Sequence, residues 1–213
     1  MDFLPEEISQ YVEEHSQAEP KVLKELNRET WQKVLQPRML SGHLQGRVLS
    51  MLTKLISPKV ILEIGTYTGY SAICMAEGLP EGGKIISIDR NEELEEIQQK
   101  YFSKSGYADK IQQIYGNALD EIPKLNEKFD LVFVDADKSN YANYYDLVIE
   151  KMNPGGVILS DNVLWSGKVT ETPKEKDIDT TALIQYNKKI NEDKRVETVL
   201  LPIRDGLTIT RVK

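Results

Sequence analysis

Apolar residues follow two alternating patterns from residue 59 onward. Short, nearly unbroken apolar runs, typical of strands buried on both faces, alternate with segments whose apolar side chains recur at helical spacing. This alternation predicts β-α-β units and a mainly parallel sheet. The strands are expected at residues 59–64, 84–88, 111–115 and 129–134, with a fifth directly after a turn at 153–156.

Two further apolar runs, at residues 195–201 and 206–212, close the chain. The link at 202–206 is too short for the crossover helix that parallel neighbours require, so these strands must pair antiparallel or lie apart. We therefore expect an α/β fold: a seven-stranded, mainly parallel sheet with its last strand antiparallel and helices on both faces.

Residues 1–58 show helical patterns only. Pro5 and Pro20 occupy positions typical of the first turn of a helix, and leucines and a valine at positions 44, 48, 52 and 55 form one apolar face. We interpret residues 1–213 as one domain in which 1–58 is a helical extension packed on the sheet. Part of this extension could instead form a dimer contact.

Composition narrows the class of protein. The 213 residues are enough for one α/β domain, and the net charge of −7 disfavours sequence-independent binding to nucleic acid or to an anionic membrane. The N-terminus lacks the pattern of a signal peptide, and no apolar run has the length of a membrane span. Cys74 is the only cysteine, which excludes an internal disulfide. A cytoplasmic location is the simplest expectation.

Two of the expected strands end on carboxylates. Asp135 follows the run 129–134, and Asp161 and Asn162 follow the fifth run. Because the carboxyl ends of parallel strands meet at one edge of a sheet, these side chains should converge as three oxygen ligands for a hard cation such as Mg²⁺. A lone strand-end aspartate is often only a cap, but two carboxylates and an amide on two strands favour a metal site.

Lys138 stands three residues beyond Asp135. A surface position is the default for a lysine, yet a neighbouring divalent cation disfavours its charged form and suits it to act as a base. Zinc is not expected, because His15, His43 and Cys74 are isolated from one another in the sequence. Mg²⁺ is preferred, with Ca²⁺ or Mn²⁺ as alternatives.

A glycine loop links the first strand to its helix. Glu63, Gly65, Gly69 and Ser71 follow an E-x-G-x-x-x-G spacing, which differs from the G-x-G-x-x-G of dinucleotide-binding domains. Free N–H groups at the following helix would suit a small carboxylate, whereas the alternative is a plain glycine turn. Asp89, at the end of the second strand, then fits a ribose diol better than a simple helix N-terminal acid.

Three weaker signals remain. Asn117 and Ala118, after the third strand, could border an adenine ring, although Asn117 alone is typical of a helix N-cap. Trp165 lies in the long loop 163–180, where it could cover a flat substrate. Tyr141 and Tyr145 are better explained by core packing of the fourth helix.

The segments 63–71, 134–138 and 160–162 resemble the cation-dependent O-methyltransferases that use S-adenosylmethionine, the catechol and caffeoyl-CoA group in its small bacterial branch. The resemblance covers nearly the whole chain and implies a Rossmann-like fold, a homodimer and a set of residue roles. It implies metal ligation by Asp135, Asp161 and Asn162, and base catalysis by Lys138 beside Asp135. For the cofactor it implies contacts from Met39, Ser41, Glu63, Gly65, Ser71, Asp89, Ala118 and Asp137. One departure is Asn117, where many relatives carry an acid.

The implied reaction moves a methyl group from S-adenosylmethionine to a hydroxyl of a small catechol-like or phenolic acceptor with vicinal hydroxyls. One alternative is the same chemistry on a hydroxylated uridine of tRNA, for which Arg38, Lys54 and Lys168 could form a basic rim. A nicotinamide-dependent dehydrogenase is a more distant alternative, because the third glycine of its motif is missing. The last alternative is a binding module without catalytic activity.

Overall fold

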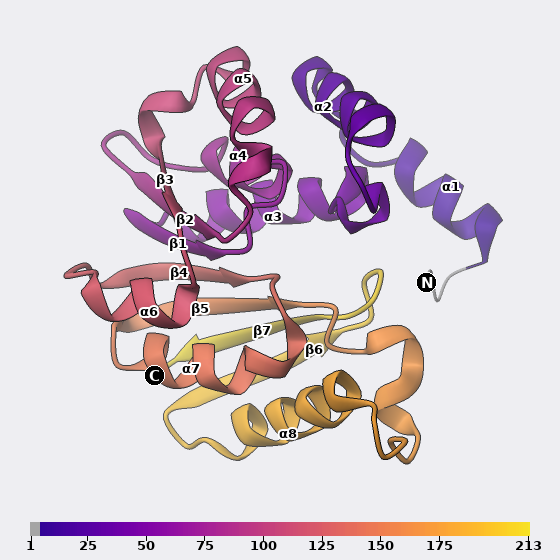
Figure 1. Ribbon diagram of the computed structural model, residues 1–213, viewed down its shortest axis with the longest axis vertical. Helices are drawn as coiled ribbons and strands as arrows, with labels where there is room; N and C mark the ends of the chain where they lie inside the picture. The colour runs from indigo at the N-terminus through magenta and orange to yellow at the C-terminus, as the bar shows by residue number, and fades with distance from the viewer. Residues whose placement is uncertain (1–4) are drawn as a thin grey trace. The chain divides into compact units, whose positions relative to one another are not determined.

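The computed structural model describes residues 5–213, and it contains a seven-stranded sheet (Figure 1). The strand order is β3-β2-β1-β4-β5-β7-β6. The strand β7 pairs antiparallel with both β5 and β6, and the other described pairings are parallel. The predicted fold, with the last strand of the sequence reversed, is confirmed. The reversed strand lies inside the sheet, so β6 forms the edge.

The described residues divide into two compact units. The N-terminal unit comprises the chain up to Lys59 together with Gly65–Gly116, and the C-terminal unit comprises Val60–Ile64 and Asn117–Lys213.

The N-terminal unit is mostly helical. Pro5 and Pro20 immediately precede the first two helices, where their fixed backbone suits the entry into a helix. Three helices lie within the stretch 1–58, in which helices were predicted; its residues 1–4 lie outside the described residues. The elements are α1 (Glu6–Glu14), α2 (Lys21–Lys33), α3 (Gly42–Ile56), α4 (Tyr70–Ala76), β2 (Lys84–Asp89), α5 (Glu95–Ser105) and β3 (Ile111–Tyr115).

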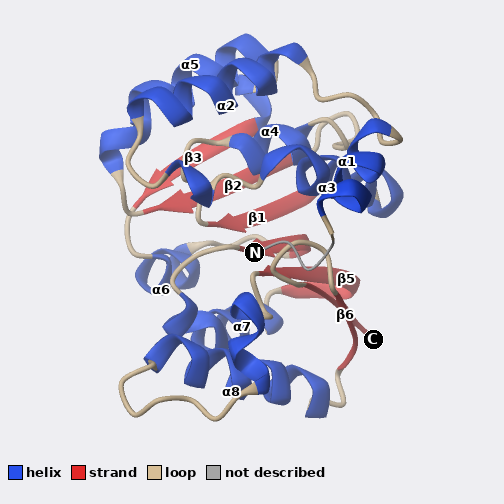
Figure 2. Ribbon diagram, turned by 90° about the vertical axis from the view of Figure 1, so that its right-hand side faces the viewer, coloured by secondary structure: helices blue, strands red, loops and turns tan. Residues whose placement is uncertain are grey.

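Helices α2 and α5 lie side by side in this unit, as both ribbon views show (Figures 1 and 2). Glu29 of α2 forms ion pairs with Lys33 of its own helix and with Lys100 of α5, and it also accepts a hydrogen bond from Tyr101. Elsewhere in the unit, Arg47 of α3 pairs with Glu77, which follows α4, at 2.8 Å. Polar contacts therefore fix the packing of both helix pairs.

The C-terminal unit holds five strands and three α-helices. Its elements are β1 (Val60–Ile64), α6 (Ala118–Glu121), β4 (Phe129–Val134), α7 (Tyr141–Ile149), β5 (Met152–Asp161), α8 (Ile178–Glu192), β6 (Val196–Leu201) and β7 (Leu207–Val212). Helices α7 and α8 lie next to each other (Figure 2). Tyr141, Tyr145 and Tyr186 are buried there, with Tyr186 in edge contact with the other two rings. The prediction that Tyr141 and Tyr145 belong to the core is confirmed.

The path around β5 differs from the prediction in two places. The expected turn at 153–156 lies within β5, where the pairing register with β4 shifts between Phe129 and Leu131. Gly155 permits this irregularity through its positive φ of 79°. The loop 163–180 also contains the short segment η6 (Trp165–Thr170), in which helical turns are interrupted by a kink at Ser166 and Gly167.

No helix among residues 5–213 combines the length and the apolar character that crossing a membrane requires.

Candidate active site

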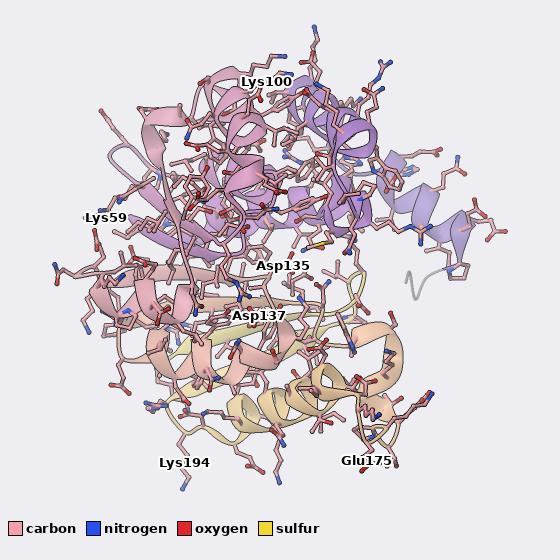
Figure 3. The ribbon with its side chains drawn as sticks, in the orientation of Figure 1. Lys59, Lys100, Asp135, Asp137, Glu175 and Lys194 are labelled. Atoms are coloured by element: carbon pink, nitrogen blue, oxygen red, sulfur yellow. The ribbon has the colours of Figure 1, made fainter. Side chains whose placement is uncertain are left out.

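Two residues that follow strands of the C-terminal unit, Asp135 and Asn162, meet at the Lys138 side chain. Asp135 follows β4, Asp161 ends β5, and Lys138 begins the short turn that leads into α7 (Figure 3 labels Asp135). The Nζ atom of Lys138 lies 3.1 Å from Oδ1 of Asp135 and 2.9 Å from Oδ1 of Asn162. The structure therefore brings oxygens from the ends of two strands to one positive charge.

Lys138 is not a surface lysine. Only 7% of the residue is exposed, and its ammonium group donates a third hydrogen bond to the Tyr141 hydroxyl at 2.7 Å. The ring of Tyr141 is 4.8 Å away, and that of Trp165 is 6.0 Å away, distances at which aromatic faces attract a cation. A side chain so held has one position, as a reacting group requires.

The Tyr141 hydroxyl is the contact that sequence reasoning missed. It accepts from Lys138 and donates to the backbone carbonyl of Asp161 at 2.9 Å. Burial raises the pKa of Tyr141 well above its usual range, and the charges of Asp135 and Asp161 act in the same direction. The hydroxyl therefore stays protonated and orients Lys138. In the sequence, the position of Tyr141 three residues after Lys138, at the start of a helix, is the feature that could have indicated this contact.

Asp161 is nearly buried, and its Oδ1 accepts the backbone N–H of Asn162 at 2.8 Å. Asp135 and Asp161 carry two negative charges against the single positive charge of Lys138. Carboxylates that are largely removed from water, as these two are, are stabilised by further positive charge nearby. Two carboxylates and an amide oxygen form the donor set that Mg²⁺ or Ca²⁺ prefers, so these residues fit a hard divalent cation.

Residues 5–213 contain no group of three or more His, Cys, Asp or Glu side chains able to hold a metal. A cation at this place would thus need the Asn162 amide oxygen in addition to the two carboxylates. His15 and His43 each bond a backbone carbonyl in the N-terminal unit, and Cys74 is buried there.

Asp137 is oriented by the helix that follows it (Figure 3 labels it). Tyr144 of α7 donates a hydrogen bond to its Oδ1 at 2.5 Å, and Asn140 donates to its other oxygen. In the same unit, Asn117 caps α6 by accepting the N–H of Leu119 at 3.2 Å, as its position suggested. Ala118 is buried at the start of α6, and Glu63 is fully buried in β1.

The glycine loop of the N-terminal unit is held by Asp89. One carboxylate oxygen accepts the backbone N–H groups of Thr66 at 2.9 Å and Tyr67 at 2.7 Å, and the other accepts that of Asn91. A carboxylate has about four acceptor sites, so these three contacts leave capacity for a hydroxyl. Gly69, at φ 89°, approaches Phe102 so closely that a Cβ would lie 2.5 Å from the ring.

One further segment of the N-terminal unit, residues 35–36, contacts this loop. The Tyr67 hydroxyl contacts the carbonyls of Leu35 and Gln36, just before the turn η1 (Pro37–Met39) that carries Met39. Met39 is exposed, whereas Ser41 and Ser71 are buried. The Met39–Ser41 segment therefore follows a stretch of chain that contacts the glycine loop.

Comparison with known proteins assigns the class. A family model described as O-methyltransferase matches residues 13–213. Caffeoyl-CoA O-methyltransferase 1 of Arabidopsis thaliana is 40% identical over 219 residues, which cover 97% of this chain and 84% of that protein.

Two solved structures extend the likeness to three dimensions. An O-methyltransferase from Bacillus cereus, solved in complex with SAH, matches with a TM-score of 0.90 and 28% identity over 97% of each chain. The O-methyltransferase TomG from Streptomyces achromogenes, solved with SAM, matches with a TM-score of 0.88 and 27% identity over 97% of this chain and 96% of its own.

The chain belongs to the O-methyltransferase family. The predicted enzyme class, an S-adenosylmethionine-dependent O-methyltransferase, and its Rossmann-like fold are confirmed. This membership argues against the alternatives of a dehydrogenase and of a non-catalytic module.

Proposed function

We propose that this enzyme transfers the methyl group of S-adenosylmethionine to a phenolic hydroxyl that has a second hydroxyl beside it, with the help of a divalent cation. The observation that carries the proposal is the convergence of Asp135 and Asn162, from the ends of β4 and β5, on the Lys138 ammonium. The name of the Arabidopsis relative supports a phenolic acceptor.

Asp135, Asp161 and Asn162 would hold the cation, with Mg²⁺ preferred over Ca²⁺ or Mn²⁺. When bound, the cation supplies a Lewis acid that stabilises negative charge on the acceptor oxygen. Lys138 contacts two of the three side chains, so the ammonium and a cation would compete for the same oxygens.

Lys138 is the proposed proton acceptor for the reacting hydroxyl. Tyr141 holds the nitrogen through its hydroxyl, which in turn is fixed to the Asp161 carbonyl. A base positioned in this way contributes roughly 10²–10⁴ in rate. The remaining contribution of the chain is alignment of the two reactants.

The methyl donor supplies an electrophilic methyl group. In the N-terminal unit we assign its binding to Met39, Ser41, Gly65, Ser71 and Asp89, with Asp89 facing the ribose hydroxyls. In the C-terminal unit we assign it to Glu63, Ala118 and Asp137. The fixed carboxylate of Asp137, held by Tyr144, would suit the donor's amino group.

A metal-exchange assay tests the proposal. The purified enzyme is treated with EDTA, desalted and assayed with labelled S-adenosylmethionine and catechol, caffeoyl-CoA or bulk tRNA as acceptor. We expect methylation of the phenolic acceptors to be lost after EDTA and restored by Mg²⁺.

Full phenolic methylation in EDTA would remove the cation from the mechanism. Methylation of tRNA alone would replace the phenolic acceptor by the nucleoside one. A monophenol that reacts as well as catechol would remove the requirement for vicinal hydroxyls.

A further inference from the structure

The segment of the C-terminal unit that carries Trp165 has an unusual backbone. Asn162, Trp165 and Ser166 have φ values of 59°, 49° and 56°, in the left-handed region that residues other than glycine seldom adopt. Gly167 follows at 82°. A strained backbone of this kind is kept only where contacts with surrounding residues hold it in place.

The turn between β6 and β7 provides those contacts. The N–H of Leu164 donates to the carbonyl of Asp205 at 2.9 Å, and that of Ser166 donates to the Asp205 carboxylate at 2.5 Å. The N–H of Val163 reaches the carbonyl of Gly206 at 3.3 Å. Two residues of one turn therefore fix three positions of the Trp165 segment.

Gly206 makes this approach possible. It has φ 90°, and a Cβ at this position would lie 2.5 Å from the Cγ atom of Leu164. The two segments are therefore in direct backbone contact, and a side chain at position 206 would separate them.

The result of this contact is the position of the Trp165 ring. The ring centroid is 6.0 Å from Nζ of Lys138, the proposed base. An aromatic acceptor whose hydroxyl reaches Lys138 would lie within contact of the indole. Offset or edge contacts between aromatic rings add stabilisation beyond simple burial.

We propose that Asp205 is a positioning residue, which fixes Trp165 beside Lys138 through the Ser166 N–H and thereby sets the affinity for a flat aromatic acceptor. This inference rests on the proposed function for its kinetic consequence. The bond to Ser166 is charge-assisted, which makes it stronger than a bond between neutral groups.

The first test measures the position of Trp165 without any reaction. The chain has two tryptophans, so Trp31→Phe leaves Trp165 as the sole reporter. In that background we compare Asp205→Ala, Asp205→Asn and the control Glu197→Ala at the far end of the same hairpin. We expect acrylamide quenching of Trp165 to increase in Asp205→Ala only, because the side-chain amide oxygen in Asp205→Asn can still accept the Ser166 N–H.

The second test is kinetic. We expect Asp205→Ala to raise the acceptor KM about tenfold, with the donor KM unchanged, and Asp205→Asn to recover most of the loss. Trp165→Leu should raise the acceptor KM similarly, and the double variant should add little to it, as expected when one residue acts through the other.

Quenching of Trp165 that stays unchanged in Asp205→Ala overturns the proposal, as does an equal rise in both KM values. If Asp205→Ala fails to fold, an acceptor KM that is unchanged in Trp165→Leu also overturns the proposal. Failure of the proposed function is distinguishable, because the parent enzyme would then methylate no phenolic acceptor while the quenching result would still report on Asp205.

Discussion

The two units hold the carboxylates to which we assign a function by different means. In the N-terminal unit, Asp89 accepts three backbone N–H groups whose positions are set by the chain itself. In the C-terminal unit, Asp135 is paired with the Lys138 side chain, which also binds Asn162. Backbone donors cannot be exchanged for anything added to the solution, whereas an ammonium group can be exchanged for another cation.

Because of this difference, substitutions at Asp89 and at Lys138 should affect stability and activity in different ways. A change at Asp89 should alter the glycine loop and donor binding together, since the loop and the proposed donor contact share one carboxylate. A change at Lys138 should remove the reaction, while its effect on stability should depend on which cation is present. The following predictions test this contrast, starting with the largest effect.

Replacing the Lys138 side chain should have the largest effect. Lys138→Met removes the proposed base and its ion pair with Asp135. We expect kcat to fall by roughly 10²–10⁴ and not to recover with Mg²⁺. The melting temperature should fall in EDTA and recover with Mg²⁺, because a bound ion stabilises the folded state.

The control for this variant is Lys188→Met, at an exposed lysine of α8 in the same unit. It should retain both activity and stability. A Lys138→Met enzyme with kcat within a few-fold of the parent would exclude Lys138 as the base.

Removing the Asp89 carboxylate should have the next largest effect. Asp89→Ala leaves the N–H groups of Thr66 and Tyr67 without their acceptor, at a cost of about 1–3 kcal/mol for each that stays buried. We expect the donor KM to rise by roughly one to two orders of magnitude and the melting temperature to fall, with no recovery in Mg²⁺. Asp109→Ala, an exposed aspartate of the same unit, is the control. A normal melting temperature in Asp89→Ala would show that the loop does not need this carboxylate.

The positions of the strand-end carboxylates could be predicted from the sequence because buried strands leave a clear pattern in it. A buried parallel strand is a continuous apolar run, so the residues after it, such as Asp135 and Asp89, are placed by the sheet. The contacts of Tyr141 and Asp205 could not be predicted in the same way. Asp205 lies 39 residues from Ser166, and their bond depends on the path of two loops that no periodic pattern encodes. The irregular start of β5 escaped prediction for a related reason, because a glycine turn and a register shift have the same local sequence.

Adding a methyl group to the glycine loop should have a smaller effect. Gly69→Ala places a Cβ 2.5 Å from the Phe102 ring, whereas Gly82→Ala, at a similar φ of 73°, meets nothing within 4 Å. The two variants share the backbone strain, so their difference isolates the steric clash. We expect Gly69→Ala to be less stable than Gly82→Ala by about 1–3 kcal/mol in urea unfolding, and to raise the donor KM. Equal stabilities would mean that the loop moves freely away from α5.

The smallest effect concerns Glu29, which joins α2 to α5. The hydrogen bond from Lys100, followed by those from Lys33 and Tyr101, lowers the pKa of Glu29 from 4.5 to about 2. A carboxyl with a depressed pKa contributes stability that is present above its unfolded value and is lost as the pH falls toward its folded value. The contribution should therefore be complete above about pH 4.5 and should disappear between pH 4.5 and about 2.

Glu29→Gln removes this titration and keeps the shape of the side chain. Unfolding in urea at several pH values should give a parent that exceeds Glu29→Gln by on the order of 1 kcal/mol at pH 6, a modest value because solvent screens the pair. The difference should shrink as the pH approaches 2. Glu25→Gln, on the same helix and more exposed, controls for the loss of any acidic charge from α2. A difference in stability that is the same at pH 6 and near pH 2 would show that the charge of Glu29 does not contribute to the packing of α2 on α5. The ion pairs of Glu29 would then differ from the backbone contacts of Asp89, which we expect to contribute measurably to the stability of the same unit.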